Sequence, residues 1–394
     1  MDYSTNKIKT AGKTLIKINN DEASLDVLSF WRSLHAEPLD MATELVESTG
    51  IKINKNVLVA SRLKRTESVV NKLCRLKNKV QLSTMNDIAG CRAILPNLKE
   101  VNKLVGKLSK DKTFKKFRDY INTPRDSGYR SIHMIGKFLN SEYDKYMNVE
   151  LQIRTVVQHS WATAVEIVDL FTKDSIKTNQ GSKEWSDFFT QLSKLFFILD
   201  KSFDLASQNK KIDVNNKDEY FQEAYKIFFS ECSKARVFDD VIKMSDLISE
   251  LDIVNKFQLF AKSVKLTIED NKDLMFEDGY ILLVIDKNSD NNFKVESKTY
   301  HKDLVEEATK DYLIAEKKVI DNEHYVTALV SSNSMGEIEK AYPNYFADST
   351  SFSEYIFLIM ALKKEYNKIS SPLAKNNFKI IQEIKSLAIG NKIL

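Results

Sequence analysis

The sequence has little of the material from which disulfide scaffolds, zinc modules and membrane spans are built. Its 394 residues include only three cysteines, Cys74, Cys91 and Cys232, which are far apart and form no CxxC pair. This spacing indicates neither a disulfide framework nor a zinc knuckle, so we expect three small, buried or half-buried hydrophobic side chains. The longest apolar runs, such as Tyr355–Leu362, are far shorter than the roughly 20 residues of a membrane-spanning helix, and the polar N-terminus has no signal-peptide core. We therefore predict a cytoplasmic protein without a membrane span.

The sequence also lacks internal repeats, low-complexity tracts and a large net charge. Lys and Arg total 59 against 55 Asp and Glu, and the formal charge of +4 is too small by itself to indicate nucleic-acid or membrane binding. The charge is unevenly distributed. Residues 1–170 carry 28 basic and 19 acidic side chains, a net charge of +9, which leaves 31 basic and 36 acidic side chains, a net charge of −5, for residues 171–394. The N-terminal part should therefore attract a polyanionic ligand.

The N-terminal half combines helical and strand patterns. With 43% hydrophobic and 29% charged residues, the chain is long enough for two or three folded domains. Apolar residues at helical spacing predict helices over residues 23–80, with a break at Pro38, and a further helix over Lys99–Leu108. Three strand-like segments and a long helix complete this part: Cys91–Leu95, Ser131–Lys137, Val149–Arg154 and the helix from Val156 to about Thr172. This order predicts an α+β fold in which helices flank a mixed sheet.

The C-terminal half is predicted to be helical first and α/β afterwards. Residues 183–265 contain no Pro or Gly and should be helical throughout. The strands and helices expected beyond them are Tyr280–Ile285, Phe293–Ser297, Lys302–Lys318, Tyr325–Val330 and Ser351–Lys368. We divide the chain into an N-terminal helical segment (residues 1–60), an α/β domain (61–182), a helical region (183–270) and a small α/β domain (271–394).

Two short motifs combine charge with a turn into regular structure. Ser61-Arg62-Leu63-Lys64-Arg65 places three cations in four positions near the expected start of a helix. Such a run is usually a solvated helix face, but Arg and Lys together also bind a triphosphate well. In Asn86-Asp87-Ile88-Ala89-Gly90-Cys91-Arg92, an acid precedes an apolar strand. Asp87 is either a turn-capping residue or a ligand of Mg²⁺, which prefers one or two carboxylates together with substrate phosphates.

A second carboxylate for such a metal lies in Asn148-Val149-Glu150-Leu151-Gln152-Ile153-Arg154. Strict alternation places Glu150, Gln152 and Arg154 on one strand face and apolar residues on the other. The segment is either an ordinary amphipathic strand with a solvated face or part of a cleft. In the second case, Glu150 is suited to be a metal ligand or a general base for a hydroxyl nucleophile.

The stretch between the two acids contains an aromatic residue among arginines. Tyr129 lies in Pro124-Arg125-Asp126-Ser127-Gly128-Tyr129-Arg130-Ser131-Ile132-His133, and Arg118 precedes this motif in Arg118-Asp119-Tyr120-Ile121. A tyrosine beside a turn glycine usually packs in the interior. An aromatic face among guanidinium groups is also suited to stacking on a nucleobase while the phosphates are bound. His133 should lie near Tyr129, and by itself it is read as a structural histidine.

Six motifs occur in order across residues 61–162: SRLKR, NDIAGCR, FRDYI, PRDSGYRSIH, VELQIRT and QHSWA. Together they resemble the synthetase domain of the RelA/SpoT family, the alarmone pyrophosphokinases, over roughly residues 25–200. The resemblance implies a nucleotidyltransferase-like mixed-sheet fold. It also implies transfer of the β,γ-pyrophosphate of ATP to the ribose 3′-hydroxyl of GDP or GTP, with Mg²⁺ as cofactor.

The resemblance assigns a donor subsite and a metal site. Arg62, Lys64 and Arg92 match residues that bind ATP. Asp87 matches the magnesium-binding aspartate, and Glu150 matches the catalytic glutamate of the EXQIRT motif, which binds the metal and activates the 3′-hydroxyl.

The acceptor subsite is assigned in the same way. Tyr129 matches the tyrosine that stacks on the guanine, His133 matches a histidine that contacts acceptor phosphate, and Gln152 lies beside Glu150. Arg118 and Arg125 replace frequent lysines, so they keep the charge but not the geometry. Ser127 replaces a frequent asparagine, which leaves the acceptor open.

Departures from the long family members indicate a short form. His35 is the only histidine in the roughly sixty residues before Ser61, so the His and Asp ligands of a hydrolase domain are not expected. Alternatives left open are a toxin or phage-defence relative that modifies adenine nucleotides or the 3′-end of tRNA, and a catalytically idle nucleotide sensor. The C-terminal half is expected to regulate the enzyme, to bind a protein or to form a homo-oligomer, with acidic residues near the cationic cleft. Tyr342–Phe346 is either a regulatory contact or a packed corner.

Overall fold

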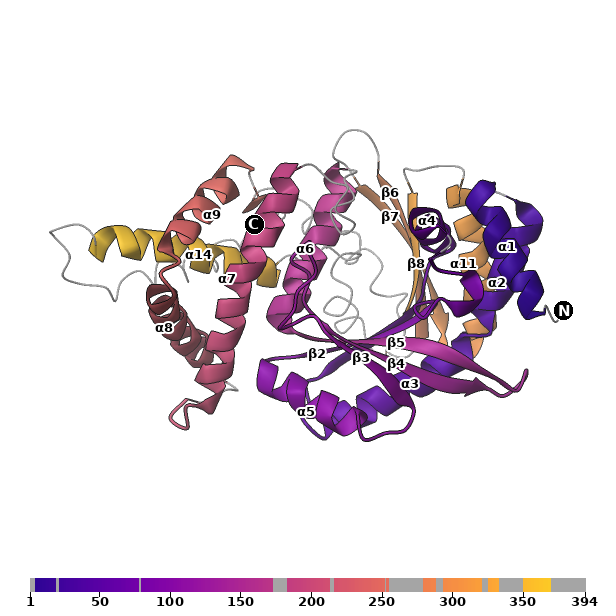
Figure 1. Ribbon diagram of the computed structural model, residues 1–394, viewed down its shortest axis with the longest axis horizontal. Coiled ribbons are helices and arrows are strands. Elements are labelled where there is room, and N and C mark those ends of the chain that lie inside the picture. The colour runs from indigo at the N-terminus through magenta and orange to yellow at the C-terminus, as the bar shows by residue number, and fades with distance from the viewer. Residues whose placement is uncertain are drawn as a thin grey trace.

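The structure is a computed structural model that describes residues 4–18, 21–77, 79–172, 183–212, 216–251, 253–254, 279–287, 293–320, 325–332 and 350–369. Figure 1 shows a five-stranded sheet in the middle, a group of helices on its left and a smaller sheet on its right. Within the described ranges, no helix is long and apolar enough to cross a membrane. The expected loop after Lys287 and the Tyr342–Phe346 segment lie outside the described residues.

The central sheet is mixed, as the sequence predicted. Its strands are β1 (Leu58–Leu63), β2 (Ala89–Leu95), β3 (Phe114–Asp119), β4 (Ile132–Asn140) and β5 (Lys145–Thr155). Their order is β1-β2-β5-β4-β3, with β2 and β5 parallel and the other neighbours antiparallel. The α+β fold class with a mixed sheet is therefore confirmed, and the three predicted strands correspond to β2, β4 and β5.

The expectation of helix throughout residues 23–80 is wrong for residues 58–63, which form strand β1. The helices around it are α2 (Glu22–Ser33), α3 (Ala36–Ile51) and α4 (Thr66–Leu76). A short apolar run such as Leu58-Val59-Ala60 fits a helix or a strand equally well, and pairing with β2 decides between them. The break expected at Pro38 falls between α2 and α3, because a proline is tolerated in the first turn of a helix.

One face of the central sheet is buried under two helices. Helices α3 and α5 (Leu98–Leu108) share a hydrophobic core with alternate residues of β5, namely Val149, Leu151 and Ile153. The strand alternation therefore turns Glu150 and Gln152 toward the opposite face. The N-terminal helix α1 (Thr5–Lys17) packs with α2 and α4 in a separate cluster.

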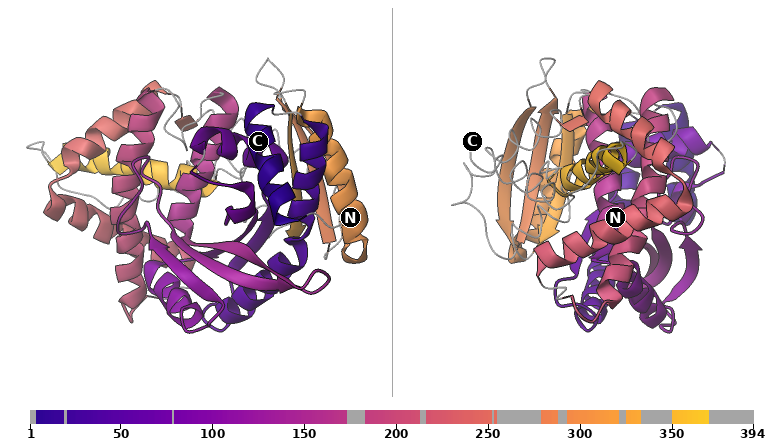
Figure 2. Two further views of the ribbon diagram at one scale, coloured as in Figure 1. Left: turned by 45° about the vertical axis from the view of Figure 1, so that its right-hand side comes forward. Right: turned by 90° about the vertical axis from the view of Figure 1, so that its left-hand side faces the viewer.

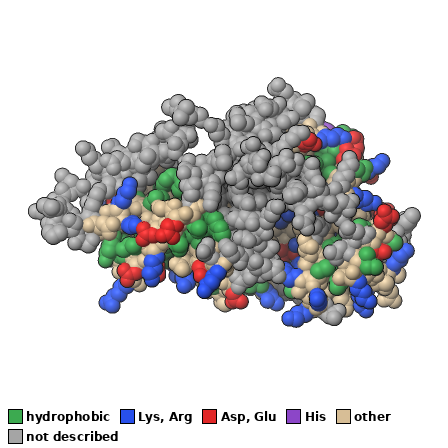
Figure 3. Space-filling view, turned by 90° about the horizontal axis from the view of Figure 1, so that it is seen from above, with side chains coloured by type: hydrophobic (Ala, Val, Ile, Leu, Met, Phe, Trp, Pro, Cys, Tyr) green, Lys and Arg blue, Asp and Glu red, His purple; other side chains and the backbone are tan. Residues whose placement is uncertain are grey.

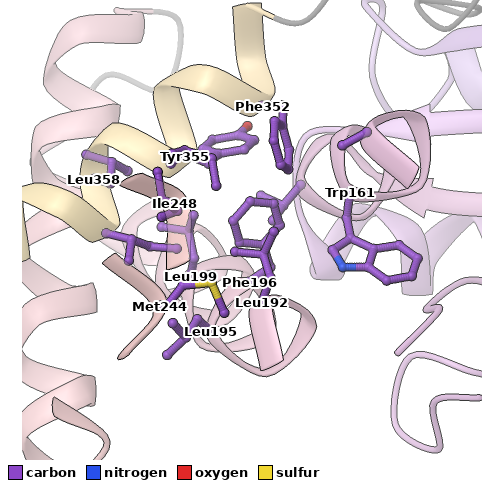
Figure 4. Close-up of a cluster of buried hydrophobic side chains, with 14 of the residues drawn as sticks. Trp161, Leu192, Leu195, Phe196, Leu199, Met244, Ile248, Phe352, Tyr355 and Leu358 are labelled. Carbon is purple, nitrogen blue, oxygen red and sulfur yellow. The ribbon is translucent and has the colours of Figure 1, made fainter. Parts of the chain in front are cut away.

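The helical part contains the largest hydrophobic core. It comprises α6 (Val156–Thr172), α7 (Lys183–Gln208), α8 (Lys217–Ala235), α9 (Phe238–Glu250) and α14 (Thr350–Ile369). Figure 4 shows Phe196 of α7 beside Phe352 and Tyr355 of α14, with Met244 and Ile248 of α9 close by. The predicted helix from residue 183 is thus interrupted after residue 208 and at residues 236–237, and most of 251–265 lies outside the described residues.

The C-terminal α/β unit is a three-stranded antiparallel sheet with one long helix. Its strands β6 (Gly279–Lys287), β7 (Phe293–His301) and β8 (Tyr325–Ser332) have the order β7-β6-β8. A short 3₁₀ turn, η4 (Lys302–Leu304), leads into α11 (Val305–Ile320), which lies against the sheet and near α2 in the left view of Figure 2. The predicted strands and helix of this unit are confirmed, whereas the boundaries between the four proposed segments stay predictions.

The coloured part of the surface carries charges of both signs. In Figure 3, basic and acidic side chains alternate at the right-hand end, and hydrophobic side chains gather at the left, over the helical part.

All three cysteines are free; Cys91 and Cys232 are buried and Cys74 is half-buried, as predicted.

Candidate functional site

The strand registers align the predicted site residues in two neighbouring rows across one face of the central sheet. Arg92 on β2, Gln152 on β5, His133 on β4 and Arg118 on β3 are direct partners across four adjacent strands. In the next row, Arg62 on β1 pairs with Gly90, which pairs with Glu150. Direct partners and residues two apart in a strand point to the same face. The sheet therefore brings residues from five separate motifs together.

Asp87 precedes the first residue of β2 and lies close to the two rows. Lys64 Nζ is 3.2 Å from Asp87 Oδ2, and Lys72 Nζ of α4 donates to Asp87 Oδ1 at 2.7 Å. The backbone N–H of Lys64 also donates to the carbonyl of Ile88 at 2.7 Å, which holds the two motifs side by side. The two ammonium groups are suited to bind an anionic ligand, and the carboxylate between them is suited to bind the cation that accompanies it.

The electrostatics of Asp87 depend on both lysines. Burial by itself raises the pKa of the Asp87 carboxyl, and the nearby Glu150 charge adds to that effect. Lys64 and Lys72 outweigh both, so the pKa is lowered overall and Asp87 is ionised at neutral pH. Burial lowers the pKa of Lys64.

Sequence reasoning missed Lys72. Its position two helical turns after Lys64 is the only signal in the sequence, and many surface lysines have similar spacing. Its role becomes visible only when α4 folds back against the start of β2.

Tyr129, His133 and Glu150 form a hydrogen-bonded chain. His133 Nδ1 lies 3.1 Å from Glu150 Oε1, and Tyr129 Oη lies 2.7 Å from His133 Nε2. An ionised carboxylate only accepts hydrogen bonds, so Nδ1 is the donor to Glu150. In the neutral imidazole, Nε2 then accepts the hydroxyl proton of Tyr129.

Gln152 and Arg154 close this chain into a ring. Gln152 Nε2 donates to Glu150 Oε2 at 2.9 Å, and an Arg154 guanidinium nitrogen donates to Gln152 Oε1 at 2.7 Å. The same nitrogen donates to the Tyr129 hydroxyl at 2.6 Å, and the Arg154 guanidinium lies 5.0 Å from the centre of the Tyr129 ring. Both Glu150 oxygens are thereby held in a fixed orientation. The sequence placed Arg154 on this face but gave no reason to connect it with Tyr129.

The ring shifts the pKa values of its members apart. Burial alone raises the pKa of Glu150, but the hydrogen bond and charge of His133, with the Gln152 amide and Lys72, bring it to about 2. Burial also acts to raise the pKa of Tyr129, and the Arg154 and His133 charges lower it to about 7. For His133, burial lowers the pKa but Tyr129 and Glu150 raise it overall. Glu150 is therefore a fixed negative charge at the centre of the site.

The predicted acceptor arginines lie around Tyr129 at the exposed edge. The Arg125 guanidinium lies 4.5 Å from the centre of the Tyr120 ring and 5.2 Å from that of Tyr129. Arg125 and Arg118 are exposed, whereas Tyr129 is half-buried. The structure thus brings together the tyrosine and the arginines that the motif predicted.

The turn before Tyr129 is fixed by helix α7. Gly128 has a φ of +86°, a left-handed conformation that glycine adopts without strain. A Cβ at this position would lie 2.9 Å from the Cβ of Ser193, so only glycine fits. The Ser193 hydroxyl donates to the Gly128 carbonyl and accepts from Arg130 Nε at 3.1 Å. Helix α7 therefore sets the position of Tyr129.

The sheet face thus gathers carboxylates, cations and aromatic rings that meet edge to face, a combination suited to binding a phosphate-bearing ligand. Residues 61–168 match the sequence model of a family described as "Region found in RelA / SpoT proteins". This match confirms, for this part of the chain, the resemblance to the RelA/SpoT family that the six motifs predicted.

Two curated relatives come from Bacillus subtilis (strain 168). GTP pyrophosphokinase YwaC is 36% identical over 112 residues, which are 26% of this chain and 53% of the relative. GTP pyrophosphokinase YjbM is 34% identical over 110 residues, 27% of this chain and 52% of the relative. The chain thus spans about half the length of the curated relatives it matches.

Solved structures give corresponding matches. The small alarmone synthetase 1 of Bacillus subtilis bound to its product pppGpp has a TM-score of 0.38 and 24% identity, over 45% of this chain and 96% of that one. The small alarmone synthetase 2 of the same organism has a TM-score of 0.38 and 25% identity, over 47% of this chain and 97% of that one.

Proposed function

We propose that this protein is a nucleotide pyrophosphokinase that transfers the β,γ-pyrophosphate of ATP to the 3′-hydroxyl of GDP or GTP and so makes (p)ppGpp. The observation that carries the proposal is the convergence of Asp87 and Glu150 with Lys64 and Lys72 on the sheet face that also carries Tyr129. The names of the curated relatives, GTP pyrophosphokinases, agree with it.

The donor subsite lies on the side of β1 and β2. We assign binding of ATP to Arg62, Lys64 and Arg92, and we add Lys72 because it reaches the same carboxylate as Lys64. Arg92 is buried, so its guanidinium is held in place for a planar contact with base or phosphate. The lysines act as point charges on the triphosphate.

The acceptor subsite lies on the side of β3 and β4. We assign stacking on the guanine to Tyr129 and contacts with the acceptor to His133, Gln152, Arg118 and Arg125. The ring of hydrogen bonds orients these side chains before the substrates bind, and such preorganisation is how enzymes stabilise developing charge at small reorganisation cost.

Asp87 and Glu150 also fit a divalent cation. They supply hard carboxylate oxygens, Glu150 from β5 and Asp87 from the turn that leads into the adjacent strand β2, and the Glu150 charge raises the electrostatic cost of ionising Asp87. In the described part of the chain no group of three or more metal-ligating side chains occurs, which suits a cation that takes its other ligands from substrate phosphates. We infer that Mg²⁺ is held by Asp87 and Glu150, where it neutralises charge on the phosphates.

In the proposed reaction, the 3′-oxygen of the acceptor forms a bond to the β-phosphorus of ATP. The bond from that phosphorus to the oxygen that bridges the α-phosphate breaks, and AMP leaves. Glu150 accepts the hydrogen bond of the 3′-hydroxyl and orients its oxygen, and the hydroxyl proton passes to solvent. Because the pKa of Glu150 is about 2, this role is mainly to orient and to stabilise charge. Positioning and charge neutralisation are the main requirements of phosphoryl transfer.

The test is to incubate the purified full chain with γ-labelled ATP, Mg²⁺ and one acceptor at a time: GDP, GTP, AMP, ADP or deacylated tRNA. We expect label in the guanine nucleotide and one AMP for each product. Label in an adenine nucleotide or in tRNA would overturn the assigned acceptor and favour the toxin or defence alternatives. Nucleotide binding without transfer to any acceptor would indicate the idle sensor.

A further inference from the structure

Helix α11 of the C-terminal unit meets the N-terminal part of the chain at the junction between β1 and α4. Figure 1 shows α11 beside α2 and α4, and strand β8 of the same unit lies next to β1. The junction begins with Lys64, whose ammonium group contacts the Asp87 carboxylate. The C-terminal unit therefore touches the segment to which we assign ATP binding.

The contact centres on the carboxylate of Glu316, which is 4% exposed. Its Oε1 accepts from the backbone N–H of Thr66 at 2.7 Å and from the Tyr312 hydroxyl at 2.7 Å. Its Oε2 accepts from the Thr66 hydroxyl at 2.9 Å and from Arg32 at 2.6 Å. Four hydrogen bonds satisfy a carboxylate in the interior, where an unsatisfied charge would be costly.

Arg32 of α2 completes the cluster and is 1% exposed. It donates to Glu316, to the Thr66 hydroxyl at 2.8 Å and to the Tyr312 hydroxyl at 3.2 Å. Burial by itself lowers the pKa of Arg32, and the Glu316 charge reverses that shift, so Arg32 remains charged. Arg32 and Glu316 are 284 residues apart in the sequence, so the pair forms only when the two ends of the chain fold together.

Glu316 takes the place of a helix cap. Arg65, at the N-cap position of α4, makes no capping hydrogen bond with its side chain. Glu316 instead accepts from the first-turn N–H of Thr66, and its negative charge lies at the positive end of the helix dipole. The start of α4, and with it the direction in which the helix carries Lys72 toward Asp87, is thus set from the opposite end of the chain.

We propose that Glu316 is a positioning residue of the ATP subsite. By capping α4, it holds the β1–α4 junction in the conformation in which Lys64 and Lys72 both reach Asp87. The inference rests on the proposed pyrophosphokinase function. Its consequence is that the C-terminal unit contributes to the donor site through the buried contact of Glu316 with Thr66, at the segment next to Lys64.

The first test is the full-length variant Glu316→Gln, which keeps the shape but removes the charge. We expect the KM for ATP to rise on the order of tenfold, as for loss of a charged helix cap, with the KM for GDP nearly unchanged. The matched control is Lys317→Ala, which removes the exposed ion pair of Lys317 with Asp26 in the same interface and should leave both constants unchanged. Equal increases in both KM values, or none, would overturn the proposal.

A second pair of variants separates positioning from simple loss of folding. Thr66→Ser keeps the hydroxyl and should keep the KM for ATP, whereas Thr66→Val removes it and should raise that KM. The double variant Arg32→Leu with Glu316→Leu leaves no buried charge unpaired but leaves α4 without its cap. It should fold and still show the selective increase, and a wild-type KM for ATP in a folded double variant would contradict the proposal.

Direct titration with a non-hydrolysable ATP analogue distinguishes a failure of the positioning role of Glu316 from a failure of the proposed function. If the wild-type chain binds the analogue but transfers nothing, the proposed function fails, and weaker binding by Glu316→Gln than by wild type still confirms the positioning role. Equal binding by the two proteins would refute that role. If wild-type protein does not bind the analogue, both proposals are wrong.

Discussion

At the scale of single residues, Glu150 and Tyr129 lie at opposite ends of one hydrogen-bonded chain with His133 between them. The two ends have different tasks. Glu150 is held ionised by the ring, with a pKa of about 2, whereas Tyr129 presents its ring at the exposed edge near Arg125. Substitutions at the two ends should therefore affect different steps.

Glu150→Gln should remove pyrophosphate transfer but leave ATP affinity and folding nearly intact. The amide keeps the size of the side chain and still accepts from His133, but it lacks the charge. We expect turnover to fall by roughly 10²–10³-fold, as for loss of one group that stabilises charge in the transition state. Steady-state rates and thermal unfolding of the variant check this, with Glu142→Gln, an exposed position on the same hairpin, as control. Wild-type turnover in Glu150→Gln would show that Glu150 is an ordinary strand residue.

Tyr129→Ala should weaken binding of the guanine nucleotide more than binding of ATP. Stacking of a base on an aromatic ring contributes about 1–3 kcal/mol, so the Kd for GDP should rise in that proportion. Tyr129→Phe keeps the ring and loses the bonds to His133 and Arg154, and it should keep most of the affinity for GDP. Separate titrations with GDP and a non-hydrolysable ATP analogue measure both. Equal losses for the two ligands would instead indicate a collapsed turn.

The site residues that sequence reasoning found are those in short motifs, because alternation along one strand fixes which side chains share a face. Glu150 and Gln152 were placed correctly for that reason. Lys72 was not connected with these residues, and Arg154 was placed on the same face as Glu150 but not connected with Tyr129, because Asp87 and Tyr129 lie on other elements. A contact such as Arg32 with Glu316 leaves no local signal at all.

At the scale of elements, helix α7 contacts the end of the strand that carries Glu150. Its Asp200 is fully buried, and one carboxylate oxygen accepts from the Thr155 hydroxyl at 2.9 Å and from Gln158 at 2.7 Å. Thr155 is the last residue of β5, so this contact joins α7 to the strand that carries Glu150. The other oxygen, Oδ1, has no hydrogen-bond partner among the described residues.

Asp200 should make stability depend on pH. Burial raises its pKa from 3.8 to about 7, so between these values the folded state binds more protons than the unfolded state. Stability therefore falls as the pH rises through this window. At 1.36 kcal/mol per pKa unit, ionised Asp200 destabilises the protein by up to about 4 kcal/mol above pH 7.

The variant Asp200→Asn should therefore be more stable than wild type at pH 8 and nearly equal to it at about pH 3.5, below both pKa values, since its amide resembles the protonated acid. Urea unfolding at the two pH values measures the difference. The same measurement on Asp204→Asn, a substitution on the same helix, is the matched control. A pH-independent difference between Asp200→Asn and wild type would contradict the shifted pKa of Asp200.

Most elements could be predicted from local patterns, and the exceptions have physical reasons. The long helices and alternating strands carry their own periodicity, as α14 and β5 show. Strand β1 could not be predicted, because its short apolar run becomes a strand only by pairing with β2. The interruptions of the helical region also lack Pro or Gly. One of them ends at Arg236, which takes a left-handed φ of 56° normally adopted by glycine.

At the scale of the whole molecule, the opposite net charges of the two parts predicted that they dock. The structure places one acidic residue, Glu316, at the segment next to Lys64, where it is buried with Arg32. Its carboxylate accepts the hydrogen bond of the first N–H of α4, and Asp87 keeps its contacts with the two lysines. Whether the C-terminal half also regulates the enzyme, binds a protein or joins two copies of the chain stays a prediction.

The packing of the helical core determines how regulation by the C-terminal half can be tested. A chain ending near Ser202 keeps most of α7 but loses α8, α9 and α14, which cover its apolar face through residues such as Phe352 and Tyr355. We expect this shortened chain to be insoluble or to lose its cooperative thermal transition, and with it the support that Ser193 gives to Gly128. Phe352→Ala in the full chain is the graded comparison and should cost about 3–5 kcal/mol, lowering the Tm without abolishing the transition. If the chain ending near Ser202 is soluble and unfolds cooperatively at the wild-type Tm, the synthetase region is independent of these helices. Otherwise, altered activity after truncation reports loss of the core, and only full-length variants at the surface of the C-terminal unit can test regulation.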